Sequence, residues 1–360
     1  MKTQGIYLAI ILVLISSLVS AQWVQTGGPT GALLTGVAAD SVGNVFVTGA
    51  DRRFRSTDEG RTWQGMPDSV LAWPVTQFCT GPNNLVLAAT PHGVYRSTTH
   101  GASWAQANSG LTDTNVVVLV TVGQGEIFAG TAMTTQSSPG GAVYRSTDNG
   151  MSWVQCTPSW HDKYVGGIAA VPHGAIIVGL ASNVSNQAGA IMRSTDGGLQ
   201  WEVAHSFWGD TSVSALALGP DGTIFAGTKR SWGSGGGGVI RSTDGGTTWT
   251  WQRIGLPDQP IWSFVFTGSG RILLSTQGIY SSTDNGDTWH PSSLGLTSYT
   301  VLQLAVGREG RLYAATYDGA CTSHDEGSTW QRSDEGMVGT RTQALLVGQD
   351  GSLFAGTSAK

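Results

Sequence analysis

The sequence predicts an all-β protein in which four-stranded antiparallel sheets stack around a ring, and three observations predict it. The pattern Ser-x-Asp-x-Gly-x-Thr-Trp occurs seven times, counting three imperfect copies. Its closing tryptophans lie 40 to 49 residues apart, and short alternating apolar segments precede each copy. A strand-rich repeat of this length indicates a propeller or a solenoid, and radial stacking, which leaves only short sheet edges, favours a β-propeller.

The repeated octapeptide has the chemistry of a structural turn. An Asp two residues before a Gly can accept hydrogen bonds from backbone N–H groups of its own turn, and the Gly adopts positive φ at little cost. The closing tryptophan is expected to be a buried apolar plug. Thr99 replaces the Asp in the second copy, and Gln200 replaces the Thr in the fourth. The residues to which we assign this structural role are Asp58, Trp63, Trp104, Asp148, Trp153, Asp196, Trp201, Asp244, Trp249, Asp284, Trp289, Asp325 and Trp330.

Each repeat contains four predicted strands, here called A to D. In the fifth unit, A is expected at residues 213–218 and B at 223–228, and the D strand is expected to include Trp249. The octapeptide forms the C–D turn. These segments alternate, are rich in β-branched residues and end at Gly, Pro and Asp, whereas no long segment has helical periodicity.

The two ends of the chain contain further strand-like segments. Residues 22–25 resemble a D strand, and residues 342–347 and 352–357 resemble an A and a B strand. We therefore predict seven full units plus a partial eighth unit shared by the termini, which gives 7–8 blades. The alternative is that the sequence is part of a longer protein.

These recurring octapeptides, with Phe-Ala-Gly-Thr in strand B, resemble the repeats of Asp-box (BNR) proteins. Their spacing is most similar to that of exported-repeat and photosystem II assembly-factor-like propellers, and more distantly to sialidase and xyloglucanase-type propellers. The resemblance covers nearly all of the sequence after residue 21 and implies a β-propeller. Of the Arg-Ile-Pro motif that sialidases carry, only Arg253-Ile254-Gly255 comes near.

The sequence divides into a signal peptide and one domain. Lys2, an apolar run over 6–19 and the small residues Ser20 and Ala21 predict a secretory signal peptide over 1–21. Residues 22–360 are expected to form a single β-propeller domain, secreted, periplasmic or at the cell surface, and monomeric. No membrane span is expected after cleavage.

Composition excludes several partner and cofactor classes. The formal net charge is −5 and the chain is poor in lysine, so we expect no nucleic-acid partner. No His/Cys spacing predicts a metal site, and no cofactor is expected. Cys79, Cys156 and Cys321 are interpreted as apolar strand residues, with one disulfide plus a free thiol as the alternative.

A candidate ligand site follows from the repeat geometry. In an A–B–C–D meander, the A–B and C–D turns share one face, so the B–C and D–A connections share the other. Three consecutive B–C links are enlarged, at 132–140, 181–188 and 229–237, and long loops on a rigid scaffold commonly bind ligands. Four carboxylates recur nine residues after their tryptophans, and three further tryptophans fall in this sector. The candidate ligand-binding residues are Asp113, Trp160, Asp162, Trp208, Asp210, Trp232 and Asp258.

Two functions fit these residues. The first is an exported binding or scaffold module for a glycan or protein ligand. The second is a glycoside hydrolase that uses the loop carboxylates as paired acids, although no catalytic residue is identified. The structural alternatives are that each Asp caps its own turn and that the tryptophans pack beneath the long loops.

Overall fold

The computed structural model describes the following residues: 34–39, 44–49, 53–57, 64–66, 75–122, 125–132, 140–157, 160, 162–171, 174–182, 188–209, 211–230, 237–296, 298–306, 310–333, 341–347 and 353–358.

Thirty strands are described within these ranges, and 28 of them form seven four-stranded sheets. We call each of these sheets a blade. The blades are β1–β4 (Leu34–Ala39, Val45–Gly49, Arg53–Ser56, Gln64–Gly65), β5–β8 (Gln77–Thr80, Val86–Thr90, Gly93–Ser97, Ala105–Gln106), β9–β12 (Val116–Val122, Glu126–Thr131, Val143–Ser146, Val154–Gln155), β13–β16 (Lys163–Ala170, Ile176–Ser182, Ala190–Ser194, Glu202–Ser206), β17–β20 (Thr211–Leu218, Ile224–Arg230, Gly238–Ser242, Thr250–Gln252), β21–β24 (Ser263–Phe266, Ile272–Thr276, Gly278–Ser282, His290–Pro291) and β25–β28 (Val301–Val306, Leu312–Thr316, Gly319–Ser323, Gln331–Arg332). The remaining pair is β29 (Arg341–Val347) and β30 (Leu353–Ser358).

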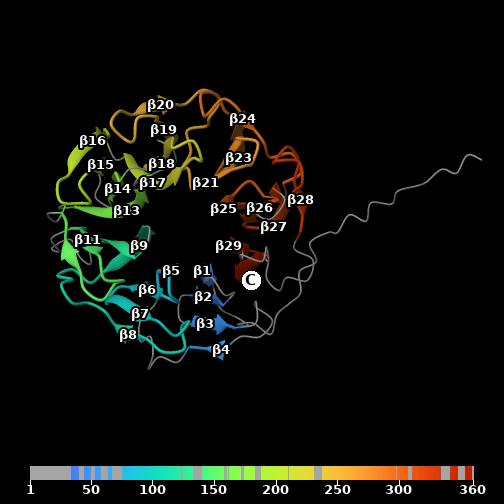
Figure 1. The fold of residues 1–360 in the computed structure, drawn as a ribbon. Coiled ribbons are helices and arrows are strands. Elements are labelled where there is room, and N and C mark those ends of the chain that lie inside the picture. Colours follow the sequence, from blue (N-terminus) through green and yellow to red (C-terminus); the bar gives the residue numbers. More distant parts are fainter. Residues whose placement is uncertain are drawn as a thin grey trace, which may run out of the picture.

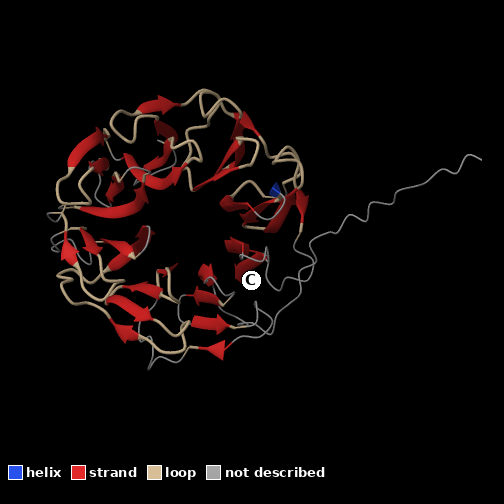
Figure 2. Ribbon diagram, in the orientation of Figure 1, coloured by secondary structure: helices blue, strands red, loops and turns tan. Residues whose placement is uncertain are grey.

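Every blade is an antiparallel meander whose strands are hydrogen-bonded in sequence order. The blades follow one another around a ring, with the first strand of each on the inside and the last on the outside (Figures 1 and 2). The predicted all-β propeller of four-stranded blades is therefore confirmed. Within the described ranges, no helix is long and apolar enough to cross a bilayer.

The two-stranded sheet β29–β30 occupies the place between the last blade and the first. β29 contacts β25 and β26 on one side and β1 on the other, and β30 also contacts β1. The last described strands thus lie beside the first ones, where the blue and red ends of the ribbon meet (Figure 1). The expected A and B strands of the partial unit are present, whereas the proposed D strand at 22–25 lies outside the described residues.

The second strand of each fully described blade is buried because it lies between two neighbouring sheets. β6, β14 and β26 are buried at every residue. Gly227 of the Phe-Ala-Gly-Thr sequence sits where an added Cβ would lie 2.7 Å from the Cβ of Ile261 in the next unit. A glycine therefore allows this close approach between blades. The threonine after it ties B to C, since Thr228 Oγ1 donates to Gly238 O at 3.2 Å.

Arginines that precede the repeated turns connect successive blades. Arg96 Nε donates to Asn149 O at 2.8 Å, and Arg193 Nε donates to Gly245 O at 2.9 Å. In each case the acceptor lies in the turn of the next blade. These arginines therefore contribute to the scaffold by joining one blade to the next. All three cysteines are free thiols.

The repeated turns are held together by the carboxylate and the preceding serine. In the turn of β19 and β20, Asp244 Oδ1 accepts from Thr247 N at 3.0 Å and Thr248 N at 2.9 Å, and Oδ2 accepts from Thr248 Oγ1 at 2.7 Å. Ser242 Oγ accepts from Gly246 N at 2.8 Å. Burial of Asp244 raises its pKa, but hydrogen bonds from Thr248, Ser242 and Thr247 outweigh this and lower it to about 2. The turn is thus stabilised by an ionised Asp.

These turns predict a loss of stability in acid. The pKa of Asp244 is lower in the folded chain than its ordinary value of 3.8, so its contribution is present above about pH 4 and is lost as the pH falls towards about 2. We expect Asp244→Asn to unfold at a lower temperature than the parent at pH 6 and to approach it at pH 2.5. Thermal unfolding followed by circular dichroism measures this, and a difference that does not change with pH would contradict it.

The second copy is a natural comparison. There Thr99 takes the Asp position, and its Oγ1 accepts from Ser103 N at 2.9 Å without a charge. We therefore expect Thr99→Ala to cost the same stability at both pH values.

Candidate functional site

The tryptophans that close the repeated turns fall into two groups. Trp153, Trp289 and Trp330 are 3%, 1% and 2% exposed, whereas Trp104, Trp201 and Trp249 are only half-buried. The expectation that all these tryptophans are buried plugs therefore holds for the first group only; Trp63 lies outside the described residues. The gaps between blades that hold the buried tryptophans are therefore more tightly filled than those that hold the half-buried ones.

A backbone contact from the preceding blade accounts for the first group. Trp153 N donates to Ser109 O at 2.8 Å, Trp289 N to Ile254 O at 2.9 Å and Trp330 N to Leu294 O at 2.8 Å. A Gly-Leu pair follows each acceptor residue. At Gly255 φ is +85°, and an added Cβ would lie 1.8 Å from Trp289 O. The chain can therefore pass this close to the tryptophan only with glycine. We call this contact the Gly-Leu latch.

The latch sequence is absent before the half-buried tryptophans. The residue six positions after Trp153 is Ser159, and the residue six positions after Trp201 is Phe207. The indole N–H groups of Trp201 and Trp249 donate instead to Gly198 O and Gly246 O of their own turns, each at 3.0 Å. These two gaps flank the blade β13–β16, which lies in the sector with enlarged B–C links. The two joints beside this blade therefore pack less closely around their tryptophans than the latched joints do.

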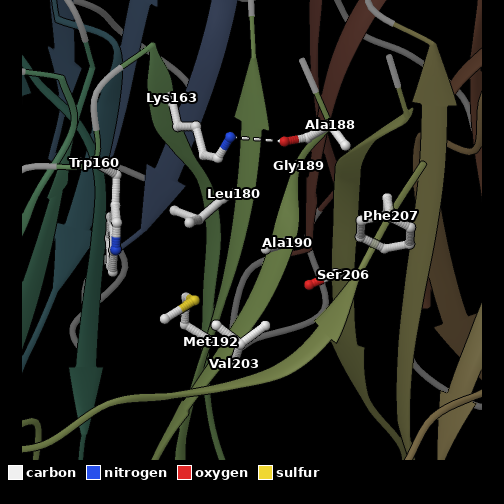
Figure 3. Close-up of a pocket in the computed structure, with 10 residues that line it drawn as sticks. All are labelled: Trp160, Lys163, Leu180, Ala188, Gly189, Ala190, Met192, Val203, Ser206 and Phe207. Carbon is white, nitrogen blue, oxygen red and sulfur yellow. Dashed lines mark hydrogen bonds between the residues drawn. The ribbon is translucent and has the colours of Figure 1, made fainter. Parts of the chain in front are cut away.

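A pocket of about 520 Å³ opens in this sector. Trp160 stands on one side of it and Phe207 on the other, with Met192 and Val203 below (Figure 3). At its upper rim, Lys163 Nζ donates to Ala188 O at 2.8 Å (Figure 3). Trp160 belongs to a D–A connection and Ala188 lies in a B–C link, so this end of the pocket lies on the face opposite the repeated turns. The remaining lining residues are Leu180, Gly189, Ala190 and Ser206.

Trp160 is fixed by both of the blades that it joins. Its backbone N–H donates to the carbonyl of Gly141, next to β11, at 2.9 Å. Its backbone carbonyl accepts from Lys163 N at 3.1 Å. Its ring meets that of Trp201 edge-on, with centroids 6.4 Å apart. Trp160, seven residues after Trp153, has the sequence position of the leucine in a Gly-Leu pair, and it forms one wall of the pocket.

The described candidate carboxylates have different surroundings. Asp113 Oδ1 accepts from Asn115 N at 3.1 Å, so it caps its own turn. Ser298, at the equivalent position, makes the corresponding bond to Thr300 N at 3.3 Å. Asp162 has φ +60°, and its carbonyl accepts from Ser182 Oγ at 2.9 Å. Asp258 is exposed.

Of the candidate tryptophans, Trp160 lines the pocket, and Trp208 is 91% exposed beside Phe207. Asp210 and Trp232 lie outside the described residues.

An aromatic group beside β16 adjoins the pocket through Phe207. His205 contacts Phe207 and Trp251, with ring centroids 4.9 and 6.4 Å away. The guanidinium of Arg253 lies over the Trp251 ring, 4.0 Å from its centroid. We did not select these residues from the sequence. Two features of the sequence could have indicated them. The segment that follows Trp201 is long for an outer strand, and the Gly-Leu pair is missing after both Trp153 and Trp201.

The carboxyl groups with clearly shifted pKa values lie in the repeated turns and in the A–B turn at Asp221, away from the candidate ligand residues. In the described part of the chain, every carboxyl group with a clearly shifted pKa has that pKa lowered. Hydrogen bonds to the carboxylate lower it by more than burial raises it. No three His, Cys, Asp or Glu side chains in the described ranges are grouped so as to hold a metal ion.

Comparison with known proteins supports the fold. A family model, the DUF6242 β-propeller domain, matches residues 221–346, about a third of the chain. No curated protein sequence matches. Among solved structures, the GH74 xyloglucanase from Xanthomonas campestris is 17% identical with a TM-score of 0.61, over 90% of this chain and 58% of that one. The GH74 enzyme from Niastella koreensis is 16% identical with a TM-score of 0.60, over 90% and 57%.

A shorter propeller is also similar. The structure of YCF48 bound to D1 peptide is 15% identical with a TM-score of 0.56, over 79% of this chain and 91% of that one. The chain thus spans less than two thirds of each GH74 enzyme but nearly the whole of YCF48. At these identities the likeness shows a shared propeller fold.

Proposed function

We propose that this protein is an exported β-propeller binding module. Its ligand site would lie on the face opposite the repeated turns, at the blade β13–β16. The observation that carries this proposal is the pocket between Trp160 and Phe207, because a concave, mainly apolar cavity with a few polar groups is the usual form of a binding site. The exposed Trp208 beside it adds apolar contact surface.

The lining of the pocket favours a protein ligand over a glycan. Glycans need several hydrogen-bonding partners for their hydroxyl groups, but the side chains around the pocket supply mainly one ammonium group, one hydroxyl and the indole of Trp160. An apolar side chain of a protein ligand suits this surface better. The solved YCF48 complex supports the proposal in one respect, since a propeller of the same fold accommodates a peptide.

Two further features belong to this proposal. Residues 1–21 are a secretory signal peptide, supported by Lys2 and the apolar run after it. The repeated turns are Asp-boxes, supported by their Ser–Asp–Gly hydrogen bonds. The protein acts as a monomer outside the cytoplasm, without a cofactor and without a nucleic-acid partner.

The proposal is tested by measuring ligand binding and turnover with the same protein. The purified chain would be screened on a glycan array and against a phage-displayed library of random 12-residue peptides, and glycan hits would be assayed for hydrolysis. We expect Trp160→Ala to weaken binding of the recovered ligands about tenfold or more, because it removes an aromatic wall. Tyr299→Ala is the control, since Tyr299 is 84% exposed in a D–A connection of another sector.

Two results would contradict the proposal. If Tyr299→Ala weakens binding as much as Trp160→Ala, the site is not in the pocket. If a glycan is hydrolysed and Asp162→Asn abolishes turnover while preserving binding, the glycoside hydrolase alternative is correct.

A further inference from the structure

The outer strand of the blade β13–β16 is unlike the others in the ring. β16 has five residues, whereas the other described outer strands have two, or three in β20. Very short edge strands limit the unpaired N–H and C=O groups available to another chain, and charges or prolines do the same. β16 contains neither Lys nor Pro, its one carboxylate, Glu202, is paired with Arg193, and its Val203 is 59% exposed. The protection found on the other outer edges is therefore weaker here.

The pairing of β16 indicates which backbone groups face outwards. Phe207 N donates inwards to Gly189 O at 3.4 Å, and inward and outward groups alternate along an antiparallel edge, so Ser206 presents its N–H outwards. A β-bulge lies at Ala204, because Ile191 pairs with His205 and Met192 pairs with Val203. On β24, the residue equivalent to Val203 is Pro291, which has no N–H. The bulge shifts the alternation by one residue, so Val203 presents its N–H outwards, in agreement with a proline at that position of β24.

The two sides of β16 offer different surfaces. On one side is the pocket with Trp160, Met192 and Val203. On the other are His205 and Trp251, with Arg253 over the indole.

The charges beside β16 favour an acidic partner. Lys163 and Arg253 have no carboxylate partner among the described residues, whereas Glu202 is paired with Arg193 at 2.8 Å. In the described part of the chain, the charges beside β16 that lack an oppositely charged partner are therefore positive, on a chain that is negative overall.

We propose that β16 accepts a fifth strand from a partner protein. The partner is an extended segment that places an apolar side chain in the pocket and acidic side chains near Lys163 and Arg253. Main-chain hydrogen bonds to β16 contribute affinity, and the alternating side chains contribute specificity. This inference rests on the proposed binding function and specifies the ligand.

The test uses the phage-displayed library of random 12-residue peptides on the purified full chain. We expect the recovered peptides to share an apolar residue for the pocket and, at odd spacing from it, an acidic residue for Arg253, since such residues lie on opposite sides of a strand. Synthetic peptides would then be N-methylated one residue at a time. Methylation at every second residue should abolish binding, and methylation at the residues between them should be tolerated, because only one edge of the added strand pairs with β16.

Protein variants provide an independent measurement. Val203→Pro should lower peptide affinity about tenfold or more, because it removes an outward amide, with little change in melting temperature. Gln106→Pro is the matched control at the same position of β8 and should leave affinity unchanged. Val203→Ala separates the loss of the side chain from the loss of the amide and should have the smaller effect.

The outcomes distinguish this inference from the proposed function. If peptides bind but N-methylation shows no alternation, or Val203→Pro binds them as the parent does, strand addition is wrong and the binding function stands. If only glycans bind, and Trp160→Ala weakens them, the same conclusion holds. If neither peptides nor glycans bind, both proposals fail. The N-methylation series decides the matter even if Val203→Pro does not fold.

Discussion

Replacing Trp153 by alanine should lower the free energy of unfolding by about 3–5 kcal/mol, as expected for a fully buried aromatic residue. The side chain is 3% exposed, and its indole N–H donates to Ala107 O at 2.8 Å in the preceding blade. The substitution therefore leaves a cavity between two blades and a buried carbonyl without its donor. Chemical denaturation followed by fluorescence of the remaining tryptophans would measure the loss.

Trp249→Ala is the matched comparison. Trp249 closes the same kind of turn but is half-buried, and its N–H bonds only to Gly246 O of its own turn. We expect a loss of about 1–2 kcal/mol, because less apolar surface returns to water. Equal losses for the two variants would contradict the division of these tryptophans into two groups.

Gly255→Ala should lower stability by about 2–3 kcal/mol. Part of this is the cost of φ +85° for a residue with a Cβ, about 1–2 kcal/mol. The rest arises because the new Cβ would lie 1.8 Å from Trp289 O, so the backbone must move and the bond from Trp289 N to Ile254 O is weakened. Thermal or chemical unfolding would measure the total.

The control for this prediction is Gly245→Ala. Gly245 has φ +68°, and an added Cβ meets nothing within 4 Å. His100, Asn149, Asn285 and Glu326 occupy the equivalent turn position with φ between 52° and 59°, so side chains are accepted there. We expect a loss of about 1 kcal/mol or less. If Gly245→Ala costs as much as Gly255→Ala, the latch is not the reason for the glycine.

Most of the fold could be predicted from the sequence because each blade repeats the same local chemistry. Asp244 with its serine and glycine specifies a turn, and the alternation of residues 213–218 specifies an inner strand. Such signals are local, and seven copies in register reinforce one another. The position of a tryptophan such as Trp249 was harder to predict, because its burial depends on the connection that arrives from another blade.

The candidate site was predicted only in part, for a related reason. Trp160 was selected because it breaks the repeat, and it does line the pocket. Asp113 was selected because an Asp recurs at this position, yet its carboxylate accepts a hydrogen bond within its own turn. A residue that caps a turn in each unit recurs in the same way. The long edge of β16 was not noticed, since strand length at an outer edge depends on pairing with β15 rather than on any residue pattern.

The location of the ligand site is the central claim, and hydrogen–deuterium exchange with a recovered ligand tests it most directly. Amide exchange would be compared with and without saturating ligand, peptide or glycan as the screens provide. The account predicts slower exchange in 160–163, 188–192 and 202–207, with the repeated turns around Asp244 and Asp284 unchanged. Protection confined to those turns, or to blades far from β13–β16, would contradict it.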